Sequence, residues 1–300
     1  GNRVAVKSLK QEIVNNPQLR ARFQREAKTL STLNHNGIVR LNNYIEKENE
    51  IYLIMEYFEG STIDVFIANV SGPIVKERLI KLFIQILDAF EYVHNMGIIH
   101  RDIKPSNIMV DNNYKTKIID FGIGKRLEET QIYTKVETQM GTIPYMSPEQ
   151  VAASKNINHL TDIYSLGVTL YEMATAECPY NLNEIGEFAA YNLITNEPLP
   201  RASKIFPDAK IFEGIIDKAT AKNKEDRFQS CAEFKKALLN IDKDPLIKSK
   251  PKATGKSVIK EPSAASSVSS NKTVFKEPTG FAYNKNIGIV MNPLKQNFKN

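Results

Sequence analysis

The 300-residue chain contains no tryptophan, only two cysteines and no long apolar run. Cys178 and Cys231 lie far apart and have neither CxxC nor Cys/His spacing, which argues against a disulfide framework and a zinc site. No run approaches the roughly 20 apolar residues that cross a bilayer, and the opening GNRVAVKSLK has neither an initiator methionine nor a signal-peptide core. These absences predict a cytoplasmic chain that is cut from a longer protein.

Positive charge is concentrated near the C-terminus. The whole chain has 40 Lys and Arg against 34 Asp and Glu, which gives a formal charge of +6. Residues 245–300 alone hold ten Lys and two Glu, with no Arg or Asp, and so account for +8. The remaining residues then sum to about −2. A nucleic-acid-binding core is therefore not expected.

Changes in hydrophobic pattern and composition along the chain predict an α+β protein with two lobes and a tail. Residues 1–58 alternate strand-like runs with one helix, expected at about 16–34, and indicate a small β-rich lobe. Residues 59–244 are dominated by helical patterns and indicate a larger, mainly helical lobe. Residues 245–300 are rich in Lys, Ser and Pro, so burial cannot offset their ordering entropy, and we expect a disordered tail.

One helix in the second region is especially well marked. In VKERLIKLFIQILDAFEYVHNMG, apolar residues recur at steps of four, three, four and three before Gly97 ends the pattern. These residues are Leu79, Phe83, Ile86, Phe90 and Val93. They predict a helix with one face in the core of the second lobe.

Three polar residues around a predicted hairpin suggest a metal site. IMV and KIID are expected to form two short strands joined by the turn DNNY, which would bring Asn107 and Asp120 to the same end, beside Asp102. Oxygen donors that converge in this way suit Mg²⁺, which keeps several waters and takes few protein ligands. Each residue taken alone could instead be a turn-former or a helix cap.

The motifs HRDIKPSN, DFG and SPE together resemble the catalytic loop, metal-binding loop and end of the activation segment of eukaryotic-type protein kinases. The resemblance covers roughly residues 3–241. GTIPYMSPEQ and KNKEDRFQS make the chain most similar to the bacterial serine/threonine kinases. The resemblance implies a two-lobed kinase fold, ATP and Mg²⁺ as cofactors, and protein substrates with Ser or Thr acceptors.

The resemblance also implies roles in phosphoryl transfer, which depends mostly on positioning and charge neutralisation. Asp120 would hold Mg²⁺ between the β- and γ-phosphates, and Asn107 would bind a second Mg²⁺. Asp102 would accept or orient the proton of the substrate hydroxyl, while Lys104 would neutralise the transferring phosphoryl group.

The small lobe would supply a lysine for the α- and β-phosphates. VAVK places Lys7 in a β-branched strand, and its implied partner is Glu26, which falls on the apolar stripe of the predicted helix. An inward carboxylate needs a cation. A pair between Glu26 and Arg22, one helical turn earlier, is the alternative.

Further positions resemble the adenine site and the internal scaffold of the family. For adenine these are Ala5, Met55, Met109 and the backbone of Glu56 and Phe58. For the scaffold they are Asp162 beneath the catalytic loop, the pair Glu149–Arg227, and a spine of Leu30, Leu41, His100 and Phe121. A helix cap is the alternative for Asp162, and ordinary core packing is the alternative for the spine.

One element of the family is missing from the printed sequence. The glycine-rich phosphate loop should precede VAVK, but only GNR does. We expect an N-terminally truncated kinase, so that this chain binds ATP weakly and is slow or inactive. The alternative is a pseudokinase or scaffold that binds partners without catalysis.

Regulation is expected within the segment between the DFG and SPE motifs. Phosphate on Thr134 or Thr138 would neutralise Arg101 and order the segment. The alternative is that Arg101 pairs with a neighbouring carboxylate and the segment is always ordered. Thr142, in contrast, would hydrogen-bond Asp102 or Lys104. The simpler expectation for the basic tail is a solvated, extended linker. Any membrane contact would come only through this tail or through a segment outside these residues, in which case the kinase would be the cytoplasmic part of an anchored protein.

Overall fold

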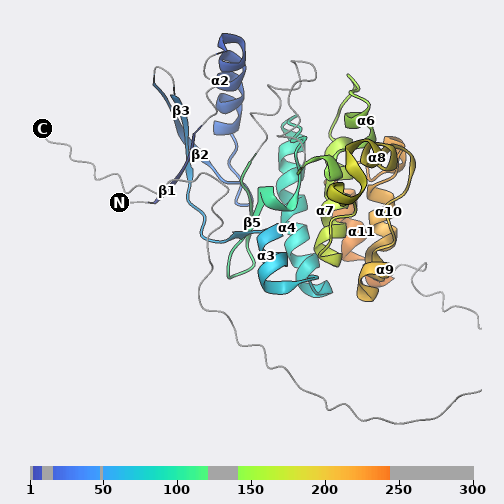
Figure 1. Cartoon of the computed structure of the whole chain (residues 1–300). Helices are drawn as coiled ribbons and strands as arrows, with labels where there is room; N and C mark the ends of the chain where they lie inside the picture. The colour runs from blue at the N-terminus through green and yellow to red at the C-terminus, as the bar shows by residue number, and fades with distance from the viewer. Residues whose placement is uncertain (1–2, 9–15, 48–49, 121–140, 244–300) are drawn as a thin grey trace, which may run out of the picture.

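The computed structural model describes residues 3–8, 16–47, 50–120 and 141–243. A small antiparallel sheet with one helix lies on one side of the molecule and a larger helical body on the other (Figure 1). The predicted α+β, two-lobed fold is therefore confirmed. The predicted tail, residues 245–300, lies outside the described residues.

The small lobe is a three-stranded antiparallel sheet covered by helix α2. Its strands β1 (Val4–Ser8), β3 (Glu50–Glu56) and β2 (Leu41–Lys47) lie side by side in that order. Helix α2 (Pro17–Ser31) starts with proline, whose missing N–H costs nothing in the first turn. Its apolar face packs on the sheet in a small buried cluster formed by Phe23, Ala27, Leu41, Ile51 and Leu53.

The large lobe is built around two long helices. The predicted periodic helix is α4 (Lys76–Asn95), and its five stripe residues are each 1% exposed or less. Helix α7 (Leu160–Thr175) is buried on all sides except at Glu172. Gly167 allows Ala219 to pack closely against this helix, because a Cβ at position 167 would lie only 2.7 Å from the Ala219 Cβ. The central position of α7 makes it the support for the loops around it.

The other elements of the large lobe surround this pair. The further α-helices are α3 (Ile63–Phe66), α6 (Pro148–Val151), α8 (Leu182–Asn196), α9 (Ala202–Ile205), α10 (Glu213–Ala219) and α11 (Cys231–Leu239). A second small sheet contains β4 (Ser61–Thr62), β5 (Ile108–Val110) and β6 (Thr116–Ile118) in that order. Short 3-10 helices are formed by Pro105–Asn107, Ile143–Tyr145, Pro207–Phe212, Lys224–Asp226 and Ile241–Lys243, and Ile67–Ser71 is a π-helix.

The segment after α2 attaches the small lobe to the large one. The Val39 amide donates to the Ile118 carbonyl and the Ile118 amide donates to the Gly37 carbonyl, each over 2.9 Å. The Tyr92 hydroxyl on α4 accepts from the Asn34 amide over 3.1 Å, and the Tyr92 ring stacks on His35. Strand β6 therefore touches both lobes just before Asp120.

None of the helices in the described residues combines the length and the apolar character needed to cross a bilayer.

Candidate active site

The predicted hairpin forms and brings the three polar residues to one end. Strands β5 and β6 pair antiparallel, with Val110 opposite Thr116. Asp111 begins the turn, and its Oδ1 accepts from the amides of Asn113 and Lys115 over 2.8 Å each. The Ile119 amide donates to the Asn107 carbonyl over 3.0 Å. Because these two backbones are joined, Asp120 leaves β6 next to Asn107.

Asp102 and Asn107 are bonded to each other inside the loop. The Asn107 Nδ2 donates to the Asp102 carbonyl over 2.8 Å and to Asp102 Oδ2 over 3.0 Å. Both residues are buried. Since the amide nitrogen is used in these two bonds, the carbonyl oxygen of the Asn107 side chain is the atom suited to ligate a cation. The bonds also fix the orientation of the Asp102 carboxylate.

A lysine lies beside the same carboxylate. The Lys104 Nζ is 3.9 Å from Asp102 Oδ1 and donates to Thr142 Oγ1 over 3.0 Å. Thr142 immediately precedes the 3-10 helix Ile143–Tyr145, near the end of the segment between the DFG and SPE motifs. The contact joins the catalytic-type loop to that segment and holds a positive charge close to Asp102.

Lys7 crosses from the small lobe to the same site. Its Nζ lies 2.6 Å from Asp120 Oδ2, and the two side chains are 45% and 31% exposed. Lys7 is therefore positioned opposite the acid that would hold the metal. The side chains of Glu26 and Arg22 are outside the described part of the structure, so the Lys7–Glu26 pair and its Arg22 alternative stay predictions.

Asp162 supports the loop from below. Its carboxylate accepts from the amides of His100 and Arg101 over 2.8 and 2.9 Å, and its Oδ2 lies 2.9 Å from His94 Nε2. Burial opposes its charge, but the bonds from His94 and the backbone lower the pKa of this carboxyl. Asp162 is in the first turn of α7, yet its oxygens face the loop, so the loop anchor is the better description than the helix cap. His94 was not found by sequence reasoning.

The loop residue before Asp102 has an unusual backbone. Arg101 has a φ of 65°, in the left-handed region that non-glycine residues rarely adopt. Its neighbour His100 is buried against Phe90, with ring centroids 5.5 Å apart. Burial lowers the pKa of His100, so its neutral form is favoured in spite of nearby acids.

The residues expected around adenine lie in the two sheets on either side of the lobe boundary. Ala5 in β1 is paired with Met55 in β3, and Met109 lies in β5. The Glu56 amide donates to the Arg40 carbonyl over 2.9 Å. The Glu56 side chain instead bonds Lys117 Nζ over 2.8 Å, a lysine that also lies 5.9 Å from the Phe58 ring.

The Lys117 contact joins β3 to β6 and was not predicted. The alternation of β6 does place Lys117 on the face opposite to its buried neighbours Thr116 and Ile118. That alternation could not name Glu56 as the partner, since the partner comes from the other lobe.

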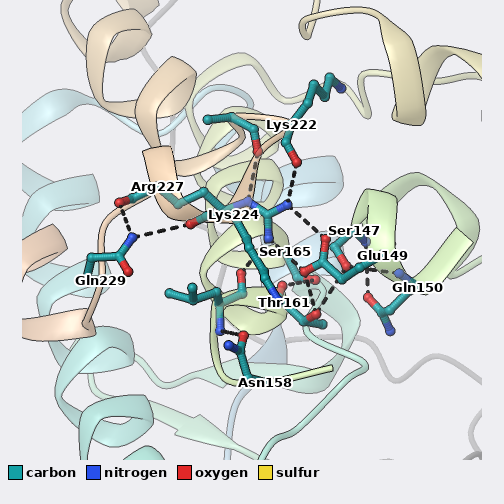
Figure 2. A network of polar contacts seen from close by, with 12 residues as sticks. Ser147, Glu149, Gln150, Asn158, Thr161, Ser165, Lys222, Lys224, Arg227 and Gln229 are labelled. Carbon is teal, nitrogen blue, oxygen red and sulfur yellow. Dashed lines mark hydrogen bonds and ion pairs between the residues drawn. The ribbon is translucent and has the colours of Figure 1, made fainter. Parts of the chain in front are cut away.

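Glu149 and Arg227 form the expected pair within a buried network (Figure 2). Arg227 donates to the two Glu149 oxygens over 2.8 and 2.9 Å. Its remaining N–H groups reach the carbonyls of Ala221, Leu160 and Lys222, so all five donors are used. Burial alone would raise the Glu149 pKa, but the bonds and charge of Arg227 lower it to about 2.

The predicted spine and the regulatory threonines have a mixed outcome. Leu41 lies in the small-lobe cluster and Leu30 packs against it. Phe121, Thr134 and Thr138 are outside the described residues. The switch on the two threonines and the closing residue of the spine therefore stay predictions.

The donors present fit a divalent cation held mostly by a ligand. Asp120 offers carboxylate oxygens and Asn107 an amide oxygen, both of the hard type that Mg²⁺ prefers. Within the described residues, His, Cys, Asp and Glu form no group of three or more that could hold a metal ion by themselves. Phosphate oxygens of a bound nucleotide would supply further ligands to the two donors.

Comparisons with a family model and with curated proteins all match protein kinases. The family described as "Protein kinase domain" matches residues 1–244. The serine/threonine-protein kinase PknB of Mycolicibacterium smegmatis is 35% identical over 243 residues, which are 79% of this chain and 38% of that protein. The probable serine/threonine-protein kinase PknB of Lactococcus lactis is 35% identical over 232 residues, 77% of this chain and 36% of that protein. The chain thus spans well under half the length of these relatives.

Solved structures agree in fold. The crystal structure of the Mycobacterium tuberculosis PknI kinase domain matches with a TM-score of 0.62 at 22% identity, covering 79% of this chain and 85% of that one. The crystal structure of Rad53 residues 1–466 in complex with AMP-PNP matches with a TM-score of 0.64 at 27% identity, covering 77% of this chain and 56% of that one.

Proposed function

Because the chain belongs to the protein kinase family, we propose that it is the catalytic part of an ATP-dependent serine/threonine protein kinase. The observation that carries the proposal is the meeting of Lys7, Asp102, Lys104, Asn107 and Asp120 at the boundary of the lobes. These side chains come from separate stretches of chain. Their retention supports catalysis over the pseudokinase alternative.

In this proposal the loop supplies the base and the charge. Asp102 orients the substrate hydroxyl and accepts its proton, with its carboxylate held by Asn107. Lys104 neutralises the charge of the phosphoryl group as it transfers. A lysine two residues after the base favours Ser or Thr as the acceptor, since the same position differs in tyrosine kinases.

Lys7, Asp120 and Asn107 hold the nucleotide. Asp120 and the Asn107 side-chain carbonyl would bind Mg²⁺, which when present neutralises the β- and γ-phosphates. The Lys7 amine, which bonds Asp120, would contact the α- and β-phosphates from the small lobe. Adenine would lie between Ala5 and Met109, beside Met55, with the backbone of Glu56 and Phe58 as hydrogen-bonding groups.

The substitution Asp102→Asn tests the assignment, in a kinase assay on the full-length protein with Mg²⁺, ATP and a Ser/Thr protein substrate. The expected result is a fall in kcat of about 100-fold or more with ATP binding retained, because general base catalysis contributes on this order. Asp111→Asn is the matched control, as an asparagine can still form the turn after β5. Near-normal turnover by Asp102→Asn would contradict the role.

Regulation and organisation follow from the same family. We propose that phosphate on Thr134 or Thr138 activates the enzyme by pairing with Arg101, while Thr142 positions Lys104.

Residues 1–58 and 59–244 would be the lobes and residues 245–300 a basic tail. Partners would be ATP and protein substrates but not nucleic acid. The catalytic part would lie in the cytoplasm, and any membrane contact would come from the tail or another segment.

A further inference from the structure

We propose that Gln150 is a positioning residue for the catalytic loop: it holds the carbonyl of Arg101, and thereby the residue before the catalytic base. The Gln150 Nε2 donates to the Arg101 carbonyl over 2.9 Å. The two residues lie 49 positions apart in the chain, and Gln150 is in α6, just after the activation segment. The proposal deepens the proposed kinase function and rests on it.

The amide of Gln150 can be oriented in one way only. Its side-chain Oε1 accepts from the main-chain N–H of Ser147 over 3.1 Å. The main-chain N–H of Gln150 in turn donates to Ser147 Oγ, which completes a capping box at the start of α6. A backbone N–H needs an acceptor and a backbone carbonyl needs a donor. The carboxamide therefore satisfies both, and a carboxylate in its place could satisfy only the first.

Helix α6 is a firm platform for this contact. Glu149, the residue before Gln150, is bonded to buried Arg227 by two hydrogen bonds. Ser147 lies 3.2 Å from Thr161 across the start of α7, and Thr161 donates to Glu149 over 2.7 Å. Figure 2 shows Ser147, Glu149 and Gln150 side by side in this network. A side chain that extends from such a support transmits its position to what it contacts.

The backbone of Arg101 needs the support that Gln150 provides. Its φ of 65° is intrinsically unfavourable, so surrounding bonds must maintain it. Asp162 holds the amide of Arg101 from α7, and Gln150 holds the carbonyl from α6. The carbonyl belongs to the same peptide unit as the Asp102 amide, so the two contacts together fix the direction in which Asp102 leaves the chain.

The contact also links the base to the activation segment. Residues 141–150 contain the end of that segment and the first part of α6. They contact the catalytic loop twice, through Thr142 to Lys104 and through Gln150 to Arg101. A displacement of α6 would break the second contact directly at the backbone of the catalytic loop. Loss of the Gln150 contact is therefore expected to lower kcat without changing nucleotide affinity.

The test is Gln150→Glu, which keeps length and the acceptor for Ser147 but loses the donor to Arg101. In the full-length protein we expect kcat to fall about tenfold, the effect of losing one hydrogen bond to a part-buried carbonyl, with the KM for ATP unchanged within about twofold. Amide hydrogen exchange at residues 99–104 should accelerate by about tenfold for the same reason. Gln150→Met, which also lacks the donor, should show the same exchange result if the glutamate variant folds poorly.

Gln85→Glu is the matched control. Gln85 on α4 also donates to a carbonyl, that of Tyr114, over 2.9 Å, and accepts from the Thr116 amide. It lies away from the catalytic loop, so kcat and exchange at 99–104 should stay as in the wild type. Wild-type kcat and exchange in both Gln150 variants would overturn the proposal, as would a lower kcat without faster exchange. An inactive wild type would refute the kinase function, while the exchange result would still decide the role of Gln150.

Discussion

The two lobes bury their side chains to different extents. In the described residues, the small lobe has a cluster of five buried apolar residues, whereas a continuous core of 43, all but Ile38 from the large lobe, fills the other half. On the small-lobe sheet, Tyr44 and Ile45 are 37% and 39% exposed, while every residue of α7 except Glu172 is buried. The large lobe is therefore expected to be the more rigid and the more stable half.

Their ion pairs differ in the same way. Lys7 and Asp120, which meet across the lobe boundary, are 45% and 31% exposed, whereas Arg227 and Glu149 inside the large lobe are 0% and 13% exposed. An accessible pair can exchange partners, and a buried one cannot without a large cost. The comparison teaches that Asp102, the proposed base, and its loop are held by the buried half, while Lys7, proposed to contact the nucleotide, belongs to the half that can adjust.

The largest effect on stability is expected from Arg227→Met. The substitution leaves Glu149 buried without its cation and three carbonyls without a donor. The free energy of unfolding should fall by about 3–5 kcal/mol, as measured by urea denaturation. Arg201→Met, at a pair that is 55% and 44% exposed, is the control. A loss below about 1 kcal/mol at Arg227 would show that burial does not separate the two classes of pair.

Truncation of one leucine in each lobe compares the two cores directly. Leu82→Ala in α4, at 0% exposure, should cost about 4 kcal/mol. Leu53→Ala in β3, at 4% exposure, should cost only about 2 kcal/mol because the thin small-lobe cluster can collapse around the gap. Denaturation followed by hydrogen exchange separates the lobes. Equal costs, with exchange in both lobes rising together, would mean that the lobes unfold as one unit.

Acid should weaken the buried pair in a defined range of pH. The folded pKa of Glu149 is about 2 against an ordinary value of 4.5, so the pair contributes its stability above pH 4.5 and loses it as pH falls through 2. After allowance for partial solvent screening, this contribution is about 2 kcal/mol. The stability difference between the wild type and Glu149→Gln should therefore shrink as pH falls from 4.5 to 2. A constant difference would contradict the lowered pKa.

The smallest effects should come from exposed pairs, whichever lobe they occupy. In Arg3–Glu59, which joins the small lobe to the first residue of the large lobe, the side chains are 62% and 74% exposed, and in Arg201–Asp217, within the large lobe, they are 55% and 44% exposed. Double-mutant cycles to alanine should give about 0.5 kcal/mol for each and less at high salt. A coupling well above about 1 kcal/mol for one of them would mean that the lobe, and not exposure, sets the strength of a pair.

Patterns within short stretches of sequence predicted much of the fold. The apolar stripe predicted helix α4, and all five stripe residues are among its buried residues, as expected, because a helical period acts within one element. The strands around DNNY formed the expected hairpin, although the second begins at Thr116 and ends at Ile118, not at Asp120. The small-lobe helix is shorter than the expected 16–34, since Ser31 is its last residue. End positions depend on tertiary contacts and are the least predictable.

The candidate site shows a similar limit. Spacing and family motifs identified Asp102, Asn107 and Asp120, and the hairpin explains why they meet. The same reasoning proposed Glu26 for Lys7, which stays a prediction because the Glu26 side chain lies outside the described part of the structure, while Lys7 is described with Asp120. It could not find Lys117 as the partner of Glu56, because nothing near either residue specifies the other.

The sequence by itself determined which residues are candidates for phosphoryl transfer, the period of the helices and the turn that joins β5 to β6, since all of these depend on short stretches of chain. Only the tertiary structure decided which groups support the loop. Asp162 could have been a plain helix cap and Gln150 a plain capping-box residue. Both hold the backbone of Arg101 because the packing of α6 and α7 against the loop brings distant groups within hydrogen-bonding distance, and partial burial raises the cost of losing each bond.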